Sequence, residues 1–309
     1  MKKLLAIALV GMLVLTGCGK GNETPETPET PGTETSAVKV GTAVVNGVKA
    51  EDAGEKAGKF ESNVTYATVV LEDGVIKSVF IDTAQNSVAF TDAGLEEFVA
   101  KGTKKELGDA YGMSEKGFVE WDKQIASLEE YLVGKTPADV KADTASSDLN
   151  STVSITIDGY IEAVNKAIES AVAVEGLDKV GTVSSVSAKT EDPAKVEINT
   201  VVTAVGLDKD GKVVYAFADE SQLKAAITGA TVVAGEELRT KGQQGNDYGM
   251  SENGMVEWDQ QVKTLVDWTK GKNAEEIAKA GDEADVPSTV SIYIGGLVST
   301  LEAAVKAAK

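Results

Sequence analysis

The chain contains no histidine, and its only cysteine, Cys18, lies close to the N-terminus. Iron–sulfur clusters, c-type haem and thiolate zinc sites take cysteine or histidine ligands, and a disulfide needs two cysteines. A serine-protease type of catalytic triad needs a histidine base. We therefore expect no metal site, and any redox or group-transfer chemistry in the folded part must come from an organic cofactor.

Basic residues are also scarce, with 30 Lys and Arg against 49 Asp and Glu and a net charge of −19. Such a surface lacks the cations that neutralise phosphates, so we expect no nucleic-acid partner. The acidic excess also disfavours close adsorption to anionic lipid, and solubility alone would explain it equally well.

The N-terminal residues have the pattern of a secretion signal. Lys2 and Lys3 precede the apolar run LLAIALVGMLVL, which is too short to be interpreted as a membrane-spanning helix. The next residues, Leu15-Thr16-Gly17-Cys18, resemble a bacterial lipobox, in which the cysteine is lipidated and becomes the first mature residue. We expect residues 1–17 to be a lipoprotein signal peptide and Cys18 to be the lipidation site.

Residues 18–37 form a segment rich in Thr, Pro and Glu that contains three of the six prolines. This composition favours extended conformers and cannot bury a core, which predicts a tether. Each buried methylene of a lipid chain contributes about 0.8 kcal/mol to anchoring. We expect a protein anchored by lipid to the cell membrane, on its extracytoplasmic face.

The rest of the chain contains the same module twice. YGMSEKGFVEWDKQ at residues 111–124 returns as YGMSENGMVEWDQQ at 248–261, and Tyr248 follows Tyr111 by 137 residues. DLNSTVSI at 148–155 returns as DVPSTVSI at 285–292 with the same spacing. We expect two tandem homologous domains, at residues 38–173 and 174–309, each of ordinary domain size.

Each module is expected to begin with strands and to end with helices. NVTYATVVLEDGVIKSVFID, residues 63–82, contains two β-branched runs around a Glu-Asp-Gly turn and predicts a hairpin. Helical spacing follows at Phe118, Trp121, Ile125, Leu128 and Leu132, with Ser114 as a candidate cap. A short helix from Pro137 and a last helix from Asp158 or Gly159 complete an α+β domain, an antiparallel sheet packed with helices.

A Ser/Thr cluster after an aspartate is repeated in both modules. On its own such a cluster is typical of a turn or a helix cap, but both copies keep Asp, Ser, Thr, Val, Ser and Ile. The segment resembles the acceptor motif of covalently flavinylated FMN-binding domains, D-x-x-[ST]-G-A-[TS]. The wider run around it resembles the FMN-binding lipoproteins of extracellular electron transfer in Gram-positive bacteria.

The resemblance implies one covalent FMN for each domain, joined by a flavin transferase through a phosphoester to Ser154 and Ser291. It makes the following residues the flavinylation motif: Asp148, Ser151, Thr152, Asp285, Ser288 and Thr289. Thr152 and Val153 stand where Gly and Ala are usual, and Thr152 or Ser151 is an alternative acceptor.

An isoalloxazine ring needs a flat, partly apolar slot. Aromatic and thioether side chains that recur before and within the predicted helix are candidates to form it: Tyr111, Met113, Trp121, Tyr248, Met250 and Trp258. For Trp121, on the apolar helix face, a core role is the alternative.

The resemblance implies a surface electron carrier rather than an enzyme with its own substrate. Its partners would be a quinone- or flavin-linked donor in the membrane and extracellular acceptors, namely ferric iron, soluble flavins or surface reductases. Two alternatives remain open at this point. One is a ligand-binding or adhesive lipoprotein without cofactor, and the other is a flavin-dependent extracellular reductase.

Overall fold

The computed structural model describes residues 37–142, 153–281, 286 and 290–309. Residues 36–309 form one compact unit. We call residues 38–173 the first half and 174–309 the second half. The predicted signal peptide, Cys18 and nearly all of the predicted tether lie outside the described residues.

The first half contains a long meander of strands followed by short helices. Its strands are β1 (Val38–Glu51), β2 (Gly58–Glu72), β3 (Val75–Thr91), β4 (Gly94–Leu95) and, after the helices, β5 (Val172–Ala173). Its helices are α1 (Lys104–Leu107), α2 (Trp121–Leu132), α3 (Pro137–Ala142) and α4 (Asp158–Glu169), with 3-10 turns at Gly108–Tyr111 and Ser114–Lys116.

The second half repeats this order. Its strands are β6 (Lys179–Lys189), β7 (Lys195–Leu207), β8 (Val213–Thr228) and β9 (Thr231–Ala234). Its helices are α5 (Lys241–Gln244), α6 (Trp258–Thr269), α7 (Ala274–Ala278) and α8 (Gly295–Ala307), with 3-10 turns at Gly245–Tyr248, Ser251–Asn253 and Lys279–Gly281.

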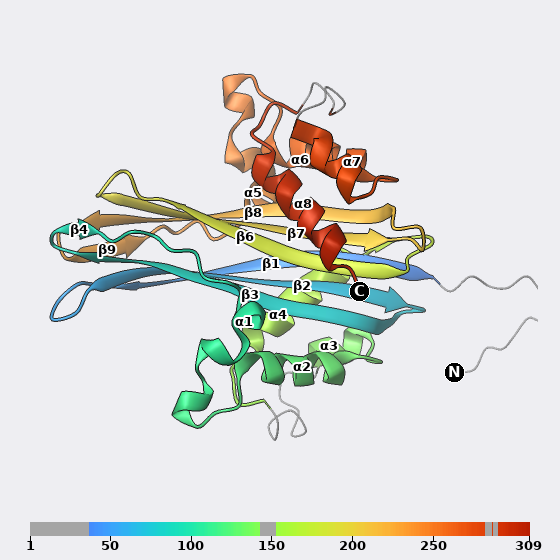
Figure 1. Ribbon diagram of the computed structural model, residues 1–309, viewed down its shortest axis with the longest axis horizontal. Helices are drawn as coiled ribbons and strands as arrows, with labels where there is room; N and C mark the ends of the chain where they lie inside the picture. Colours follow the sequence, from blue (N-terminus) through green and yellow to red (C-terminus); the bar gives the residue numbers. More distant parts are fainter. Residues whose placement is uncertain (1–36, 143–152, 282–285, 287–289) are drawn as a thin grey trace, which may run out of the picture. The chain divides into compact units, whose positions relative to one another are not determined.

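The strands form two antiparallel sheets that pack face to face (Figure 1). The sheet orders are β4-β3-β2-β1-β5 and β6-β7-β8-β9. Phe60 and Val64 of β2 share one buried cluster with Ile198 of β7 and Leu223 of β8. The predicted α+β class is therefore confirmed, and the inner faces of the two sheets cover each other.

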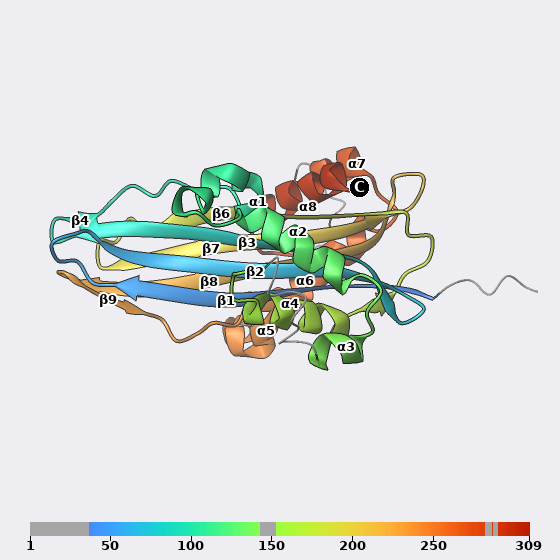
Figure 2. The same ribbon diagram turned by 90° about the horizontal axis from the view of Figure 1, so that it is seen from below.

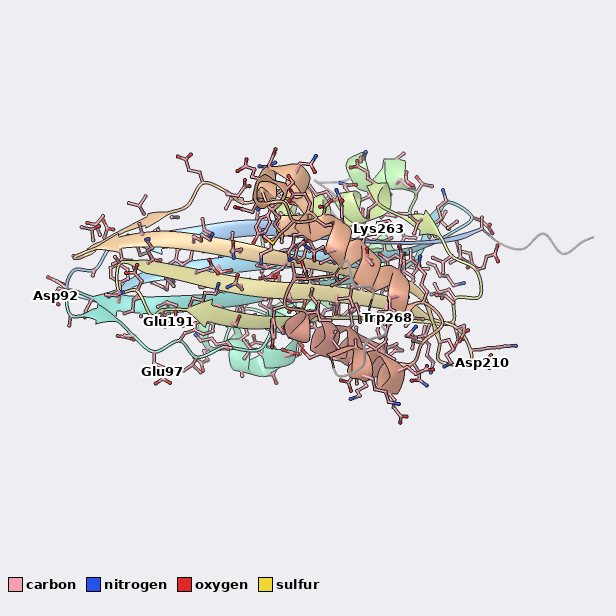
Figure 3. The ribbon with its side chains drawn as sticks, turned by 90° about the horizontal axis from the view of Figure 1, so that it is seen from above. Asp92, Glu97, Glu191, Asp210, Lys263 and Trp268 are labelled. Atoms are coloured by element: carbon pink, nitrogen blue, oxygen red, sulfur yellow. The ribbon has the colours of Figure 1, made fainter. Side chains whose placement is uncertain are left out.

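The helices cover the outer faces of the two sheets (Figures 1 and 2). Helix α4 packs on β1 and β2 and α2 packs on β3, while α8 and α6 pack on the second sheet. Lys263 and Trp268 mark α6 in Figure 3. The chain is thus arranged in four layers, helix–sheet–sheet–helix, and a central strand such as β2 is buried on both faces.

Several acidic side chains lie where the chain reverses direction. Asp92, Glu97, Glu191 and Asp210 are exposed in loops between or after strands (Figure 3). These positions keep like charges away from the apolar interior, so the large negative charge is compatible with two packed sheets.

The predicted hairpin over residues 63–82 is confirmed, and the second half contains the equivalent hairpin. β2 pairs with β3 around a turn in which Asp73 and Gly74 have φ of 52° and 84°, and β7 pairs with β8 around Gly211, with φ of 75°. Left-handed backbone is the reason that Gly and Asp suit these turns. The predicted helices from Pro137 and Asp158 are also confirmed as α3 and α4.

The expected start of the helix predicted at Phe118 to Leu132 is wrong. α2 begins at Trp121, and Phe118 lies before it with 53 % of its surface exposed. The carboxylate of Glu120 accepts hydrogen bonds from the backbone N–H groups of Met113 and Ser114, so residues 113–120 close into a loop. Ser114 therefore lies inside a 3-10 turn and does not cap α2.

Hydroxyl groups connect the two sheets in the buried interface. Thr68 Oγ1 is hydrogen-bonded to Thr42 Oγ1 at 3.0 Å and accepts from Thr182 Oγ1 at 2.8 Å. Tyr215 Oη donates to Thr42 Oγ1 at 3.0 Å, and burial raises the pKa of Tyr215 to about 12. Because buried polar groups need partners, this cluster favours one alignment of the sheets.

The last helix of each half approaches one strand of its sheet very closely, α4 on β1 and α8 on β6. A Cβ atom on Gly41 would lie 1.9 Å from the carbonyl oxygen of Ala167 in α4, and a Cβ on Gly181 would lie 2.0 Å from that of Ala304 in α8. Both contacts involve backbone, which a rotamer change cannot relieve.

Among the described residues, no helix is both long and apolar enough to cross a membrane.

Replacing Gly41 or Gly181 by alanine should lower the free energy of unfolding by about 1–3 kcal/mol, because the helix must move away from its sheet. Urea unfolding of the full chain measures this. Gly47→Ala is the matched control in β1, since its nearest atoms are 3.9 and 4.0 Å away. An equal loss for all three variants would refute the close-contact explanation.

Candidate functional site

The predicted acceptor Ser154 is exposed and lies just before α4. The buried side chain of Gln124, in α2, fixes its position. Gln124 Oε1 accepts hydrogen bonds from Ser154 N at 2.6 Å, Ser154 Oγ at 3.2 Å and Ile155 N at 3.2 Å. Gln124 Nε2 donates to the carbonyl of Val119 at 2.7 Å. The serine is thus tied to the loop that precedes α2.

The second half has the same arrangement. Gln261 Oε1 accepts from Ser291 N at 2.6 Å, Ser291 Oγ at 3.2 Å and Ile292 N at 3.1 Å, and its Nε2 donates to Val256 at 2.6 Å. Both glutamines have 0 % exposed surface. The backbone N–H donors require the amide oxygen to face the serine, so the amide orientation follows from the network.

This geometry leaves the serine hydroxyl available for chemistry. Its oxygen donates one hydrogen bond inward and retains acceptor lone pairs on the solvent side. A hydroxyl held in this way is suited to form a phosphoester, because its position is set by a buried group while its oxygen remains accessible.

The loop before α2 places apolar side chains on the surface beside the serine. Gly112 and Gly117 turn the chain with φ of 82° and 79°. The hydrogen bonds from Met113 N and Ser114 N to the Glu120 carboxylate then close the loop before α2. Hydrogen bonds from the side chain and backbone of Ser114 lower the pKa of Glu120, which keeps this carboxylate charged. Phe118 and Val119 are 53 % and 56 % exposed.

The equivalent loop of the second half exposes Met255 and Val256 by 44 % and 41 %. Glu257 accepts from the N–H groups of Met250 and Ser251, as Glu120 does in the first half. The sequence interpretation missed these apolar pairs because Phe118 fits the helical spacing of α2. The glycine at 117 and its repeat at 254 were the available signal.

The predicted ring contacts fall into two groups. Trp121 and Trp258 are 1 % and 4 % exposed and belong to the cores between helix and sheet, and Trp121 Nε1 donates to Tyr160 Oη at 2.9 Å. This burial favours the core role over ligand contact. Tyr111, Met113, Tyr248 and Met250 are partly buried at the edges of the same cores.

A polar cluster on the outer face of the first sheet lies next to Tyr111. Tyr111 Oη donates to Gln85 Oε1 at 2.8 Å, and Gln85 Nε2 donates to Glu61 Oε1 at 2.8 Å. Asn63 donates to the same carboxylate at 3.0 Å. In the second sheet Glu197 accepts from Asn199 and Gln222. The repeated Glu-x-Asn of β2 and β7 was the sequence signal for this cluster.

Each half has a lysine next to its tyrosine and tryptophan rings, and the two lysines differ in their ion-pair partners. Lys104 Nζ lies 5.1 Å from the Tyr111 ring centroid and 5.4 Å from that of Trp121, and it makes no ion pair with a described residue. Lys241 has the same ring contacts with Tyr248 and Trp258 but pairs with Glu220 at 2.9 Å. Thr83 stands where the second half has Glu220. Burial lowers the pKa of Lys104 to about 8.

The remaining motif residues cannot be placed. Asp148, Ser151, Thr152, Asp285, Ser288 and Thr289 lie outside the described residues. In the part of the chain that the structure does describe, no three acidic or cysteine side chains gather as metal ligands would.

Two grooves between the halves do not include either serine. One of about 680 Å³ is lined by Phe80, Thr182 and Lys309 among others, and one of about 620 Å³ by Phe217 and Trp258.

Comparison with family models, with curated proteins and with solved structures found no match to this chain.

The stability contribution of Lys104 should depend on pH. Its folded pKa of about 8 lies below the unfolded value of 10.5, so the unfolded chain binds more protons between these values. The free energy of unfolding of the wild type, relative to Lys104→Met, should therefore rise as the pH is raised from 7 to 10. Urea unfolding at both pH values measures the change.

Lys241→Met is the matched variant for this experiment. It leaves the Glu220 carboxylate buried without its partner, so it should be destabilising at pH 7. A wild-type advantage over Lys104→Met that does not change with pH would contradict the lowering of the Lys104 pKa by burial.

Proposed function

We propose that the protein is a lipid-anchored electron carrier of the Gram-positive cell surface with FMN attached to Ser154 and Ser291. Each half would be one FMN-binding-type domain of a tandem homologous pair. Electrons would come from a quinone- or flavin-linked membrane donor and pass to ferric iron, soluble flavins or surface reductases. When bound, FMN would supply reversible one- and two-electron transfer.

The observation that carries the proposal is the hydrogen-bonded pair of a buried glutamine and a serine, which is present in both halves. An exposed serine, at the position that the flavinylation motif makes the acceptor, is held by a buried glutamine with nearly identical hydrogen-bond lengths in both halves. Folding alone rarely needs an exposed hydroxyl at a fixed place, whereas attachment by a separate transferase does. The exposed apolar side chains of Phe118 and Val119 suit a planar, partly apolar ring.

The residues of the site have separate roles in this proposal. Gln124 positions the Ser154 hydroxyl, and Glu120 holds the loop that presents the apolar pair. Tyr111, fixed by Gln85, and Met113 close the inner side of that loop. The chain would thus orient the group and exclude water from one of its faces.

The first experiment measures intact mass and visible absorbance of the full chain after co-expression with a flavin transferase. We expect two FMN groups for each chain, one in Ser154→Ala, one in Ser291→Ala and none in the double variant. Peptide mapping distinguishes the alternative acceptors Ser151 and Thr152. An unmodified, colourless wild type, with the transferase active on a control substrate, would instead support a ligand-binding or adhesive lipoprotein.

Gln124→Leu should reduce FMN loading at Ser154 and leave loading at Ser291 unchanged, because the hydroxyl loses the group that positions it. Gln261→Leu should show the reciprocal pattern. Site-resolved peptide mass spectrometry reads both sites in one sample, so the unchanged half is an internal control for folding. Equal loading of the two sites in both variants would remove the glutamines from the mechanism.

An extracellular reductase and a carrier differ in acceptor range. Loaded protein that reduces several acceptors without saturation would behave as a carrier, whereas saturable turnover with one acceptor would indicate a reductase.

A further inference from the structure

The two serines are followed by different residues at two positions. Ser154 is followed by Thr156 and Asp158, and Ser291 by Tyr293 and Gly295. Tyr293 is 92 % exposed, far more than any other large side chain with apolar character among the described residues. A tyrosine ring in water contributes almost none of its apolar area to folding.

Tyr293 and Gly295 are linked by geometry. A Cβ atom on Gly295 would lie 2.5 Å from Tyr293 Oη and 2.7 Å from Cζ. The tyrosine ring therefore lies across the first residue of α8, in space that any other residue would fill. In the first half Asp158 occupies that position and Thr156 replaces the ring, so the two differences occur together.

The ring is within reach of a group on Ser291. Ser291 and Tyr293 are both exposed, whereas Ile292 between them is half-buried, so the two side chains share the outer side of the segment. Their Cα atoms are at most about 7 Å apart, since each residue of extended chain spans no more than about 3.6 Å. The ribityl phosphate chain of FMN is longer than that separation.

We infer that Tyr293 is the stacking partner of the isoalloxazine ring carried by Ser291, and that the ring carried by Ser154 has no phenol at the equivalent position, where Thr156 stands. This inference rests on the proposed function. Offset stacking of a phenol on a planar ring is favourable beyond the apolar area that it buries. The two flavins of one chain are then unequal in their surroundings.

Other aromatic side chains do not supply a second exposed phenol. Phe118 has Met255 as its counterpart and is exposed, but it carries no hydroxyl group. Tyr111 and Tyr248 are equivalent to each other, and both are partly buried. Tyr160 has no tyrosine counterpart in the second half, but its ring packs edge-on against Trp121 at 5.7 Å and its hydroxyl accepts the indole N–H.

Flavin fluorescence tests the inference, because a stacked phenol donates an electron to the excited ring and recovers it, which quenches emission. The loaded full-length Ser154→Ala protein carries flavin only on Ser291, and Ser291→Ala carries it only on Ser154. We expect the emission per bound flavin to be several-fold weaker in Ser154→Ala. Adding Tyr293→Thr, the residue type of the first half, should restore it to the level of Ser291→Ala.

The reciprocal transfer completes the design. Thr156→Tyr together with Asp158→Gly, in the Ser291→Ala background, should quench the flavin on Ser154. Tyr293→Phe keeps the ring but removes the easily oxidised phenol, so it should recover emission while peptide mapping still finds the flavin attached.

The outcomes separate the two proposals. A wild type without covalent flavin would overturn both the proposed function and this inference. Flavin loaded on both serines, with emission that Tyr293→Thr leaves unchanged, would overturn only the role of Tyr293.

Discussion

The packing of one sheet on the other is the constraint on which the remaining structure depends. Phe60 and Val64 of the first half share a buried cluster with Ile198 and Leu223 of the second, so each inner face is covered by the other half. The hydroxyl cluster around Thr68 adds partners that fit only one alignment. Helices are consequently left to cover the outer faces, and the predicted domains behave as one compact unit.

The candidate site lies where the helical cover meets the rest of the outer face. Under the helices the outer side chains are apolar, as at Val69 and Leu71, and farther along β2 they become polar at Glu61 and Asn63. The loop before α2 lies at this border and exposes apolar side chains. A buried glutamine then connects that loop with a serine thirty residues later in the chain. The buried side chain of Gln124 thus fixes the position of an exposed serine.

Both sites contain the same glutamine–serine hydrogen bonds, but the residues around them differ. Lys241 forms an ion pair with Glu220, whereas the first half has Thr83 at the position equivalent to Glu220. Thr156 and Asp158 follow one serine, and Tyr293 and Gly295 follow the other. A positive charge in the interior and a ring on the surface both change the environment of any bound group. Duplication therefore yields two sites that need not have the same properties.

The sequence by itself determined the repeat, and it predicted the hairpins and the α+β class correctly because these depend on local periodicity and turn chemistry. It placed the start of α2 wrongly, since Phe118 fits the helical spacing while Glu120 closes the preceding loop instead. Only the tertiary structure decided that the sheets cover each other, that Gln124 holds Ser154 and that Glu61 reaches Tyr111 through Gln85. Periodicity identifies an apolar face but does not identify the surface that will bury it, and contacts between distant residues leave no local pattern.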